Sequence, residues 1–181
     1  MLVKVYTRGG DDGTTSLLHG GRVEKDSPQP TAYGDVDEAQ AAIGLARASD
    51  GGELSLLLLE LERDLWVVMA ELACNPQKLE NLESTNGLVT STMVENPEAL
   101  IDDFAERFEA PKEFVAPGNN EVSARLDLAR AIVRRAERSA LAAVKEGSRV
   151  VPYLNRLSDL LWTLARYLDG DPVITKSIGA D

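Results

Sequence analysis

The sequence has one cysteine, one histidine and no hydrophobic run long enough to cross a bilayer. The single cysteine, Cys74, excludes an intramolecular disulfide and a zinc cage of thiolates, and it indicates a reducing compartment. His19 has no second histidine or cysteine near it, so neither a metal site nor a histidine base is favoured. Because the N-terminus lacks the apolar core of a targeting segment, we expect a soluble, cytoplasmic protein.

Basic side chains are also scarce. Nineteen lysines and arginines stand against thirty aspartates and glutamates, which gives a formal charge of −11. A chain of this charge repels nucleic acids and anionic lipid, so we expect no nucleic-acid or membrane partner. A phosphate-bearing ligand would therefore be small and bound locally. With 181 residues and 44% apolar content, the chain 1–181 is expected to form one domain with a substantial core.

The hydrophobic periodicity predicts an all-α fold. Residues 1–34 are rich in glycine, threonine and aspartate and are expected to form an extended loop region. Apolar residues then recur at helical spacing in five segments, namely Asp35 to about Ser49, Leu54 to Asn75, Pro97 to Phe108, Asn119 or Asn120 to about Gly147, and Val151 to Asp169. Asp35 can cap the first of these helices, and either Asn119 or Asn120 can cap the fourth. Five helices with short connections predict an up-and-down bundle over 35–169, with a polar stretch at 77–94 and a frayed tail at 170–181.

The fourth expected helix carries a cluster of arginines within an apolar pattern. At 100° per residue, Arg130, Arg134, Glu137 and Arg138 fall on one stripe, whereas Arg135 points elsewhere. Arginine keeps its charge and presents a planar fork of donors, which suits the oxygens of a polyphosphate. The stripe is therefore a candidate anion site. The alternative is a solvated face with ion pairs between successive turns.

The loop from Tyr6 to Leu17 is a second candidate anion site, since it combines three glycines, four Ser/Thr hydroxyls and one arginine. Glycines let backbone N–H groups turn around phosphate oxygens, and hydroxyls can donate to phosphate or face magnesium. It is not a Walker A loop, because no Gly-Lys-Ser/Thr follows. Lys25 could reach the same phosphates. A loop of this composition, taken alone, is more often an ordinary turn.

Two polar positions on other helices are weaker candidates. Asp37, in the first turn of the helix from Asp35, could pair with an arginine of the fourth helix, in its own subunit or in a neighbour. Asn155 and Asp159 share a face of the last helix. The Asn155 amide could bind a sugar hydroxyl, a phosphate or a cofactor amide, or it could only join two helices.

Seven segments occur in a specific order along the chain, namely VYTR at 5–8, GDDGTTSL at 10–17, AYGDVDE at 32–38, FVAPG at 114–118, AR at 129–130, RRAER at 134–138 and YLNRLSDL at 153–160. With these motifs in this order, the chain resembles the PduO-type ATP:cob(I)alamin adenosyltransferases. The resemblance implies a homotrimer of helical bundles with active sites between adjacent subunits. It also implies that the 5′-deoxyadenosyl group of ATP is transferred to cob(I)alamin with release of inorganic triphosphate.

The resemblance further implies roles for individual residues. The positions that would bind ATP are Thr7, Arg8, Gly9, Gly10, Thr15, Lys25, Arg134, Glu137, Arg138 and Asn155, with Arg135 of the same motif kept as a binding candidate. Asp37 and Arg130 would form an intersubunit pair beside the site. Phe114 would pack under the corrin and ease the reduction of cob(II)alamin by displacing the lower axial ligand. Arg134, Arg138 and Phe114 are thus the catalytic candidates, ATP is expected to arrive with Mg²⁺, and a reductase and an adenosylcobalamin-dependent mutase are the implied partners.

Three positions depart from the family pattern. Asp12 stands where a lysine is common, Asn119 where a glycine is usual, and Asp127 where a histidine is common. Asparagine tolerates unusual backbone angles, so the turn at Asn119 can persist. Asp12 could remove one cation directed at phosphate. The alternative function is therefore a carrier or sensor that binds ATP or cobalamin with weak or no catalysis.

Overall fold

The computed structural model describes residues 6–171 and 173–175. Within them the chain forms six α-helices and one two-stranded antiparallel sheet. The strands are β1 (Thr14–Ser16) and β2 (Arg22–Glu24), and the helices are α1 (Pro28–Ser49), α2 (Ser55–Ala73), α3 (Leu79–Glu83), α4 (Ser91–Ala105), α5 (Glu121–Ala140) and α6 (Val150–Asp169). The mostly helical prediction is confirmed. The predicted count of five helices is wrong, because α3 and the 3₁₀ turn Pro76–Lys78 form within the stretch expected to be irregular.

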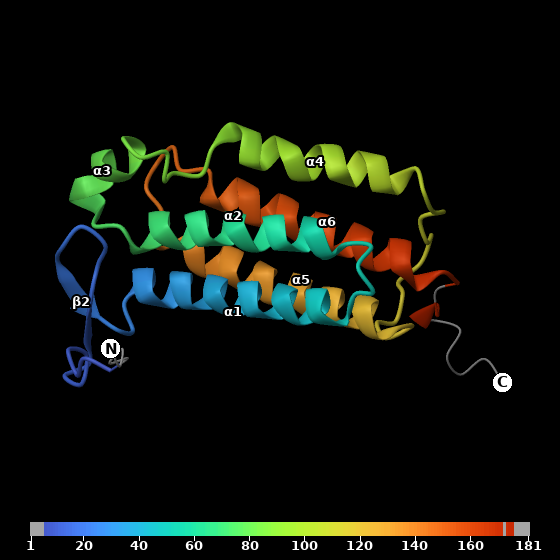
Figure 1. The fold of residues 1–181 in the computed structure, drawn as a ribbon, viewed down its shortest axis with the longest axis horizontal. Coiled ribbons are helices and arrows are strands. Elements are labelled where there is room, and N and C mark those ends of the chain that lie inside the picture. Colours follow the sequence, from blue (N-terminus) through green and yellow to red (C-terminus); the bar gives the residue numbers. More distant parts are fainter. Residues whose placement is uncertain (1–5, 172, 176–181) are drawn as a thin grey trace.

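The longer helices lie side by side as a bundle (Figure 1). Helix α1 packs against α2 and α5, α6 packs against α5, and α4 covers α6. The β1–β2 hairpin lies at one end of the bundle, beside the start of α1, and the C-terminal end of α6 lies at the opposite end (Figure 1). In the described part of the chain, no helix is both long and apolar enough to span a membrane.

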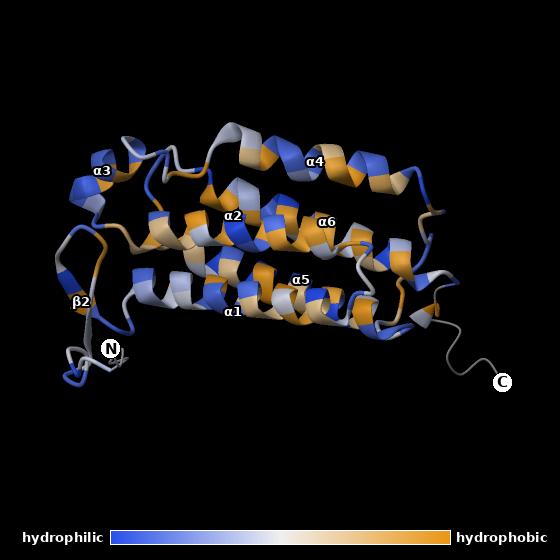
Figure 2. Cartoon of the chain, in the orientation of Figure 1, coloured by the Kyte–Doolittle hydropathy of each residue, from blue (hydrophilic) through white to orange (hydrophobic). Residues whose placement is uncertain are grey.

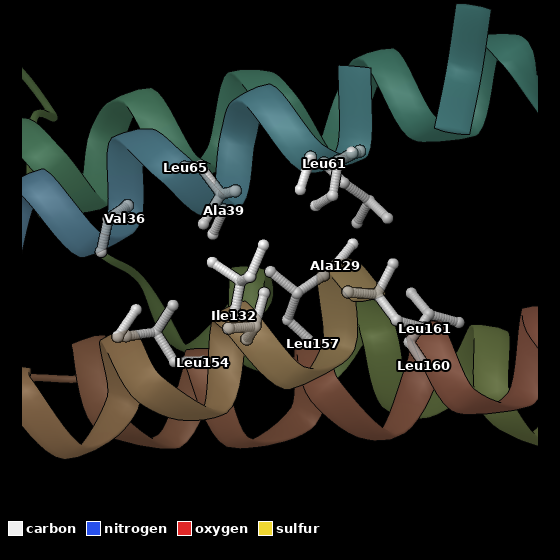
Figure 3. Packing of buried hydrophobic residues seen from close by; sticks show 14 of the residues in the cluster. Val36, Ala39, Leu61, Leu65, Ala129, Ile132, Leu154, Leu157, Leu160 and Leu161 are labelled. Atoms are coloured by element: carbon white, nitrogen blue, oxygen red, sulfur yellow. The ribbon is translucent and has the colours of Figure 1, made fainter. Parts of the chain in front are cut away.

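The core fills the space between the helices with aliphatic side chains (Figure 3). Hydrophobic and hydrophilic residues alternate along each long helix, as expected where one side is buried (Figure 2). Helices α1 and α5 face each other through small residues such as Ala39 and Ala129, which lets their backbones approach closely. Helix α6 contributes mainly leucines, including Leu154, Leu157 and Leu161.

Helix α1 begins at Pro28, seven residues before the predicted start at Asp35. The first N–H groups of a helix have no acceptor within it, so prolines at 28 and 30 cost no hydrogen bond there. Their fixed φ also suits the helical turn. Residues 28–34 are therefore helical rather than extended, and Asp35 is a half-buried residue within α1 rather than its cap.

Other boundaries differ for local reasons. Helix α4 begins at Ser91 rather than Pro97, because the Thr90 side chain accepts the N–H of Met93 at 3.2 Å and caps it. Helix α5 has the predicted Asn120 cap, as part of a capping box with Ser123. It ends at Ala140, and turns and irregular chain occupy 141–147, where helix was expected.

Part of the tail is ordered, contrary to the prediction that 170–181 is frayed. Val115 and Ile174 form an isolated antiparallel bridge. The N–H of Ala116 donates to the carbonyl oxygen of Val173 at 2.8 Å, and the N–H of Thr175 donates to that of Phe114 at 2.9 Å. Pairing with a partner distant in sequence fixes these residues. The remaining tail positions, 172 and 176–181, lie outside the described residues, as does Val5 of the first motif.

Candidate functional site

The glycine loop before β1 is held by two cations from the far side of the hairpin. The Lys25 ammonium donates to the carbonyl oxygen of Gly10 at 2.7 Å. The Arg22 guanidinium donates to the carbonyl oxygen of Gly9 at 2.6 Å. The structure therefore brings Lys25 together with the loop, as the sequence predicted. Both cations lie at the surface, where they could also contact an anion.

Gly10 is required by close packing. A Cβ atom added there would lie 3.0 Å from Nζ of Lys25 and 3.1 Å from the carbonyl oxygen of Thr14. Arg8 adopts a positive φ of 60°, which turns the chain sharply before Gly9. The Thr7 hydroxyl accepts the N–H of Gly9 at 3.4 Å. These contacts curl 7–10 into a tight turn, the geometry in which backbone N–H groups can converge on phosphate.

Asp12 shapes the loop from within. Its Oδ1 accepts the backbone N–H of Thr14 at 3.0 Å and the hydroxyl of the same residue at 2.9 Å. The donation from the Thr14 backbone is the main cause of the lowered pKa of Asp12. Asp12 also forms an ion pair with Arg22 at 3.3 Å. The acidic departure from the family pattern thus carries its own cation, which offsets its charge.

Arg22 is a residue that the sequence reasoning missed. It lies on β2 opposite Ser16 of β1, and its guanidinium contacts the loop at Gly9, Asp12 and Thr14. Thr15, a predicted ATP contact, lies on β1 opposite Val23. The sequence reasoning did not predict the hairpin. Only the β1–β2 register places Arg22 beside the loop, so the role of Arg22 could not be predicted without it.

Arg134 and Arg138 are both exposed on the last turns of α5. Arg138 donates to the backbone carbonyl oxygen of Arg134 at 2.8 Å. Among the described residues, neither side chain forms an ion pair with a carboxylate. Two fixed positive charges one turn apart at the surface are suited to bind a multivalent anion.

Two other predicted residues meet between α5 and α6. The Asn155 amide donates to Glu137 Oε1 at 3.0 Å. The other end of the amide, Oδ1, accepts from Arg156 at 2.7 Å. Glu137 precedes Arg138 on α5, so its bond to Asn155 joins α6 to the segment of α5 that carries the arginine stripe.

Arg135 turns the other way, as the helical spacing predicted. Its Nε lies 3.2 Å from Asp35 Oδ1, and Nη2 contacts Glu38 Oε2. Asp35 also accepts the hydroxyl of Ser139. Arg135 therefore joins α5 to α1 within the chain, whereas Arg134 and Arg138 do not.

The loop and the arginine stripe remain separate within one chain. Both lie toward the same end of the bundle (Figure 1). Nevertheless, no hydrogen bond or ion pair joins 7–17 to Arg134 or Arg138 in the described part of the chain. Asp37 is exposed on α1 and makes no ion pair with Arg130 there.

Phe114 borders a hollow of ≈ 480 Å³ between the 111–117 segment, α5 and α6, together with Asp127, Arg130, Trp162 and Arg166. Its side chain is 86% exposed although its backbone is held. The N–H and the hydroxyl of Thr175 both donate to the Phe114 carbonyl oxygen, each at 2.9 Å. The structure thus brings Phe114 and Arg130 to one place and presents an aromatic ring to a bulky ligand.

Buried charges form one wall of this hollow. Asp127, 5% exposed, accepts from Arg166 Nη2 at 2.5 Å, and Arg130 Nε lies 3.6 Å from the other oxygen of the same carboxylate. Arg166 Nε lies 2.8 Å from Asp169. The role of Asp127 was not anticipated from the sequence. The available signal was an acidic residue next to the apolar stripe of α5, where it needs a buried partner.

A second hollow, of ≈ 560 Å³, lies among α2, α3 and the α5–α6 connection and contains none of the predicted site residues. Glu71 lines it, but its carboxylate accepts the N–H of Val89 at 2.7 Å and the hydroxyl of Ser148 at 2.6 Å. Those oxygens are therefore occupied by the fold. Among the described residues, no three metal-binding side chains of His, Cys, Asp or Glu come together.

The described residues thus form a helical bundle with a tight glycine loop, an exposed arginine pair and a hollow bordered by Phe114. The sequence profile of the cobalamin adenosyltransferase family matches residues 5–168. The corrinoid adenosyltransferase of Mycobacterium tuberculosis is 40% identical, over 99% of this chain and 96% of that protein. The corrinoid adenosyltransferase PduO of Salmonella typhimurium is 39% identical, over 92% of this chain and 50% of that protein.

Solved structures agree with the sequence matches. A phenylalanine-to-alanine variant of the PduO-type ATP:corrinoid adenosyltransferase from Lactobacillus reuteri, complexed with cobalamin and ATP, superposes with a TM-score of 0.86. It is 27% identical and covers 96% of this chain and 99% of that chain. An arginine-to-lysine variant complexed with ATP has a TM-score of 0.83. The chain belongs to the cobalamin adenosyltransferase family.

Proposed function

We propose that the protein is an ATP:corrinoid adenosyltransferase. It transfers the 5′-deoxyadenosyl group of ATP to cob(I)alamin and gives adenosylcobalamin and inorganic triphosphate. The observation that carries the proposal is family membership over 5–168, with the tight loop, the exposed arginine pair and Phe114 at the surface. Relatives solved with cobalamin and ATP support the two substrates.

The reaction forms a bond from cobalt to C5′ of ATP and breaks the bond from C5′ to the triphosphate oxygen, which leaves with the electron pair. Cob(I)alamin is already a strong nucleophile, so the protein needs no serine, cysteine or histidine nucleophile. Its tasks are to align the reacting atoms and to stabilise charge on the leaving triphosphate. Arg134 and Arg138 perform the second task, with Lys25 and the backbone N–H groups of 7–10 around the phosphates.

Glu137 and Asn155 complete the nucleotide side of the site. Their hydrogen bond fixes both side chains beside the arginine stripe and leaves further donor and acceptor positions for the nucleoside. Thr7, Arg8 and Thr15 contribute from the loop side. Arg135 contributes indirectly, because its ion pair with Asp35 fixes the rotation of α5 against α1.

The complete site is proposed to form between subunits of a homotrimer. Supporting this, no hydrogen bond or ion pair joins the loop to Arg134 or Arg138 within the described part of the chain, and a site shared between subunits would combine them. Asp37 is exposed, and Arg130 Nε is buried without a hydrogen-bond partner among the described residues. An ion pair between Asp37 of one subunit and Arg130 of the next would give that guanidinium a second carboxylate besides Asp127.

Phe114 serves the reduction of cob(II)alamin. An exposed ring on a backbone held by Thr175 can pack under the corrin and exclude water and the lower axial ligand. Cobalt without an axial ligand accepts an electron more readily. A reductase that supplies the electron and a mutase that receives adenosylcobalamin are the proposed partners, and a cytoplasmic location fits the single buried thiol of Cys74.

Magnesium fits this site as part of the nucleotide. Hard cations bind oxygen ligands, and Mg²⁺ is commonly held by substrate phosphates and water. The loop offers the hydroxyls of Thr7, Thr15 and Ser16, while the described residues contain no carboxylate cluster that would hold the ion independently. When bound, it would neutralise charge on the triphosphate. The alternative, a carrier or sensor, is not favoured, since Asp12 is offset by Arg22.

An anaerobic assay tests the proposed function. Chemically reduced cobalamin and magnesium-ATP are mixed with the protein, and the corrin spectrum is followed. Conversion of cob(I)alamin to adenosylcobalamin over many turnovers supports the enzyme. Binding of either ligand without conversion would assign the protein to the carrier or sensor class.

A further inference from the structure

We propose that Asp127 is a positioning residue that holds Arg130 at the wall of the Phe114 hollow; this inference rests on the proposed function. Asp127 shares its carboxylate between two helices. One oxygen accepts from Arg166 of α6, and the other lies 3.6 Å from Arg130, one turn further along α5. A carboxylate this deeply buried is stable only with such partners.

The α6 side of this arrangement is rigid. The Arg166 side chain is 3% exposed and lies between Asp127 and Asp169. The ring of Trp162 lies 5.9 Å from its guanidinium carbon. Because Arg166 is fixed from several sides, the Asp127 carboxylate that it binds is fixed as well. Asp127 therefore presents a stationary negative charge to Arg130.

Arg130 is the most exposed member of this cluster, since its side chain is 32% exposed, against 5% for Asp127 and 3% for Arg166. Its Nε is buried and has no hydrogen-bond partner among the described residues, so the attraction of Asp127 is what draws it toward the hollow. Phe114 and Trp162 line the same hollow. A corrin placed over Phe114 would therefore meet Arg130, whose position depends on Asp127. ATP bound at Arg134 and Arg138 would meet no arginine that Asp127 positions.

The test compares two variants of α5, each of which removes a carboxylate that is paired with an arginine of the same helix. Asp127→Asn removes the charge that faces Arg130. The matched control Glu121→Gln removes the carboxylate that pairs with Arg125 at the surface, and Glu121 does not line the hollow. With reduced cobalamin and magnesium-ATP, Asp127→Asn is expected to raise KM for the corrin about tenfold, the loss of one charge-assisted contact. The KM for ATP should change less than about twofold. Glu121→Gln should leave both constants within about twofold of the wild type.

A double-mutant cycle identifies the intermediary. In an Arg130→Gln background, Asp127→Asn should have little further effect on corrin KM, because its action passes through Arg130. An unchanged corrin KM in Asp127→Asn, or an equal rise in Glu121→Gln, would overturn the proposal. Full additivity in the cycle would also overturn it. If Asp127→Asn fails to fold, Asp127→His, which carries the residue common there in the family, makes the same comparison.

The outcome is distinguishable from failure of the proposed function. Turnover by the wild type decides the function before any variant is compared. Without turnover, quenching of tryptophan fluorescence by cob(II)alamin still reports corrin binding, since Trp162 lines the hollow. The same comparison of Asp127→Asn with Glu121→Gln then applies to the corrin Kd.

Discussion

The Lys25 ammonium donates a hydrogen bond to the carbonyl oxygen of Gly10 at 2.7 Å. Lys25 directly follows β2, and Gly10 belongs to the glycine loop before β1. The contact closes the loop and leaves the cation at the surface. It also explains why residue 10 is a glycine, since a side chain there would displace Lys25. The loop and its cation thus form one unit.

Replacing Gly10 is expected to weaken ATP binding. The Cβ of Gly10→Val would meet Nζ of Lys25 at 3.0 Å and the Thr14 carbonyl oxygen at 3.1 Å, so the loop must open. We expect the Kd for magnesium-ATP to rise at least about tenfold, as for the loss of one charge-assisted contact. Isothermal titration calorimetry measures this. Gly51→Ala is the control, because a Cβ there has no neighbour within 4 Å; an equal Kd for both variants would refute the assignment of the loop.

Neutralising Arg134 is expected to slow the transfer itself. If its guanidinium stabilises charge on the leaving triphosphate, Arg134→Gln should lower kcat by about 10²-fold. Single-turnover kinetics with pre-reduced cobalamin isolates this step from reduction. Arg125→Gln, at the other end of α5, where Arg125 pairs with Glu121, should retain wild-type kcat. If Arg134→Gln alters only KM, its role is binding and not catalysis.

Removing the exposed ring of Phe114 is expected to separate the two half-reactions. Phe114→Ala should keep its affinity for ATP but lose at least about 90% of its turnover when cob(II)alamin and a reductant are supplied. A loss of this size is expected when a group that positions a reactant is removed. The visible spectrum of bound cob(II)alamin should lose the signature of the four-coordinate form. Trp66→Ala removes another exposed aromatic ring, on α2, and serves as the control. Unchanged turnover of Phe114→Ala would exclude the proposed wedge.

Asp64 is expected to destabilise the folded protein at neutral pH. Burial is the main cause of its raised pKa, which the hydrogen bond from Tyr153 at 3.2 Å only partly opposes. Because the folded state disfavours the carboxylate, Asp64→Asn should raise Tm at pH 7. The gain in Tm should decrease as the pH falls through the raised pKa of Asp64 in the folded protein. It should vanish below the ordinary pKa of an aspartate, where Asp64 is protonated in the unfolded chain too. Thermal unfolding at several pH values measures this, with the exposed Asp102→Asn as the control; a lower Tm for Asp64→Asn at pH 7 would contradict it.

Local patterns in the sequence were sufficient to predict the bundle. The apolar spacing of α1, α2, α5 and α6 corresponds to buried residues, and the Asn120 cap is confirmed. The start of α1 was misplaced because prolines at 28 and 30 resemble a loop signal but also fit a first helical turn. The order in 173–175 depends on pairing with Phe114 and Ala116, which no local pattern reveals.

For the candidate site, the sequence could predict only how residues are arranged on one helix. The helical spacing separated Arg135 from Arg134 and Arg138, and the structure confirms it through the ion pairs of Arg135 with α1. Arg22 and Asp127 could not be assigned in this way. The role of Arg22 depends on the register of the hairpin, and that of Asp127 on Arg166, 39 residues away in the sequence. Both are relations between distant residues, which periodicity does not encode.

The most direct test of the central claim is the product ratio of the wild-type reaction. Cob(I)alamin, generated anaerobically, is incubated with magnesium-ATP, and ³¹P NMR and the corrin spectrum quantify the products. We predict one inorganic triphosphate for each adenosylcobalamin over many turnovers. Phosphate or diphosphate as the stoichiometric product, or corrin binding without a cobalt–carbon bond, would contradict the account.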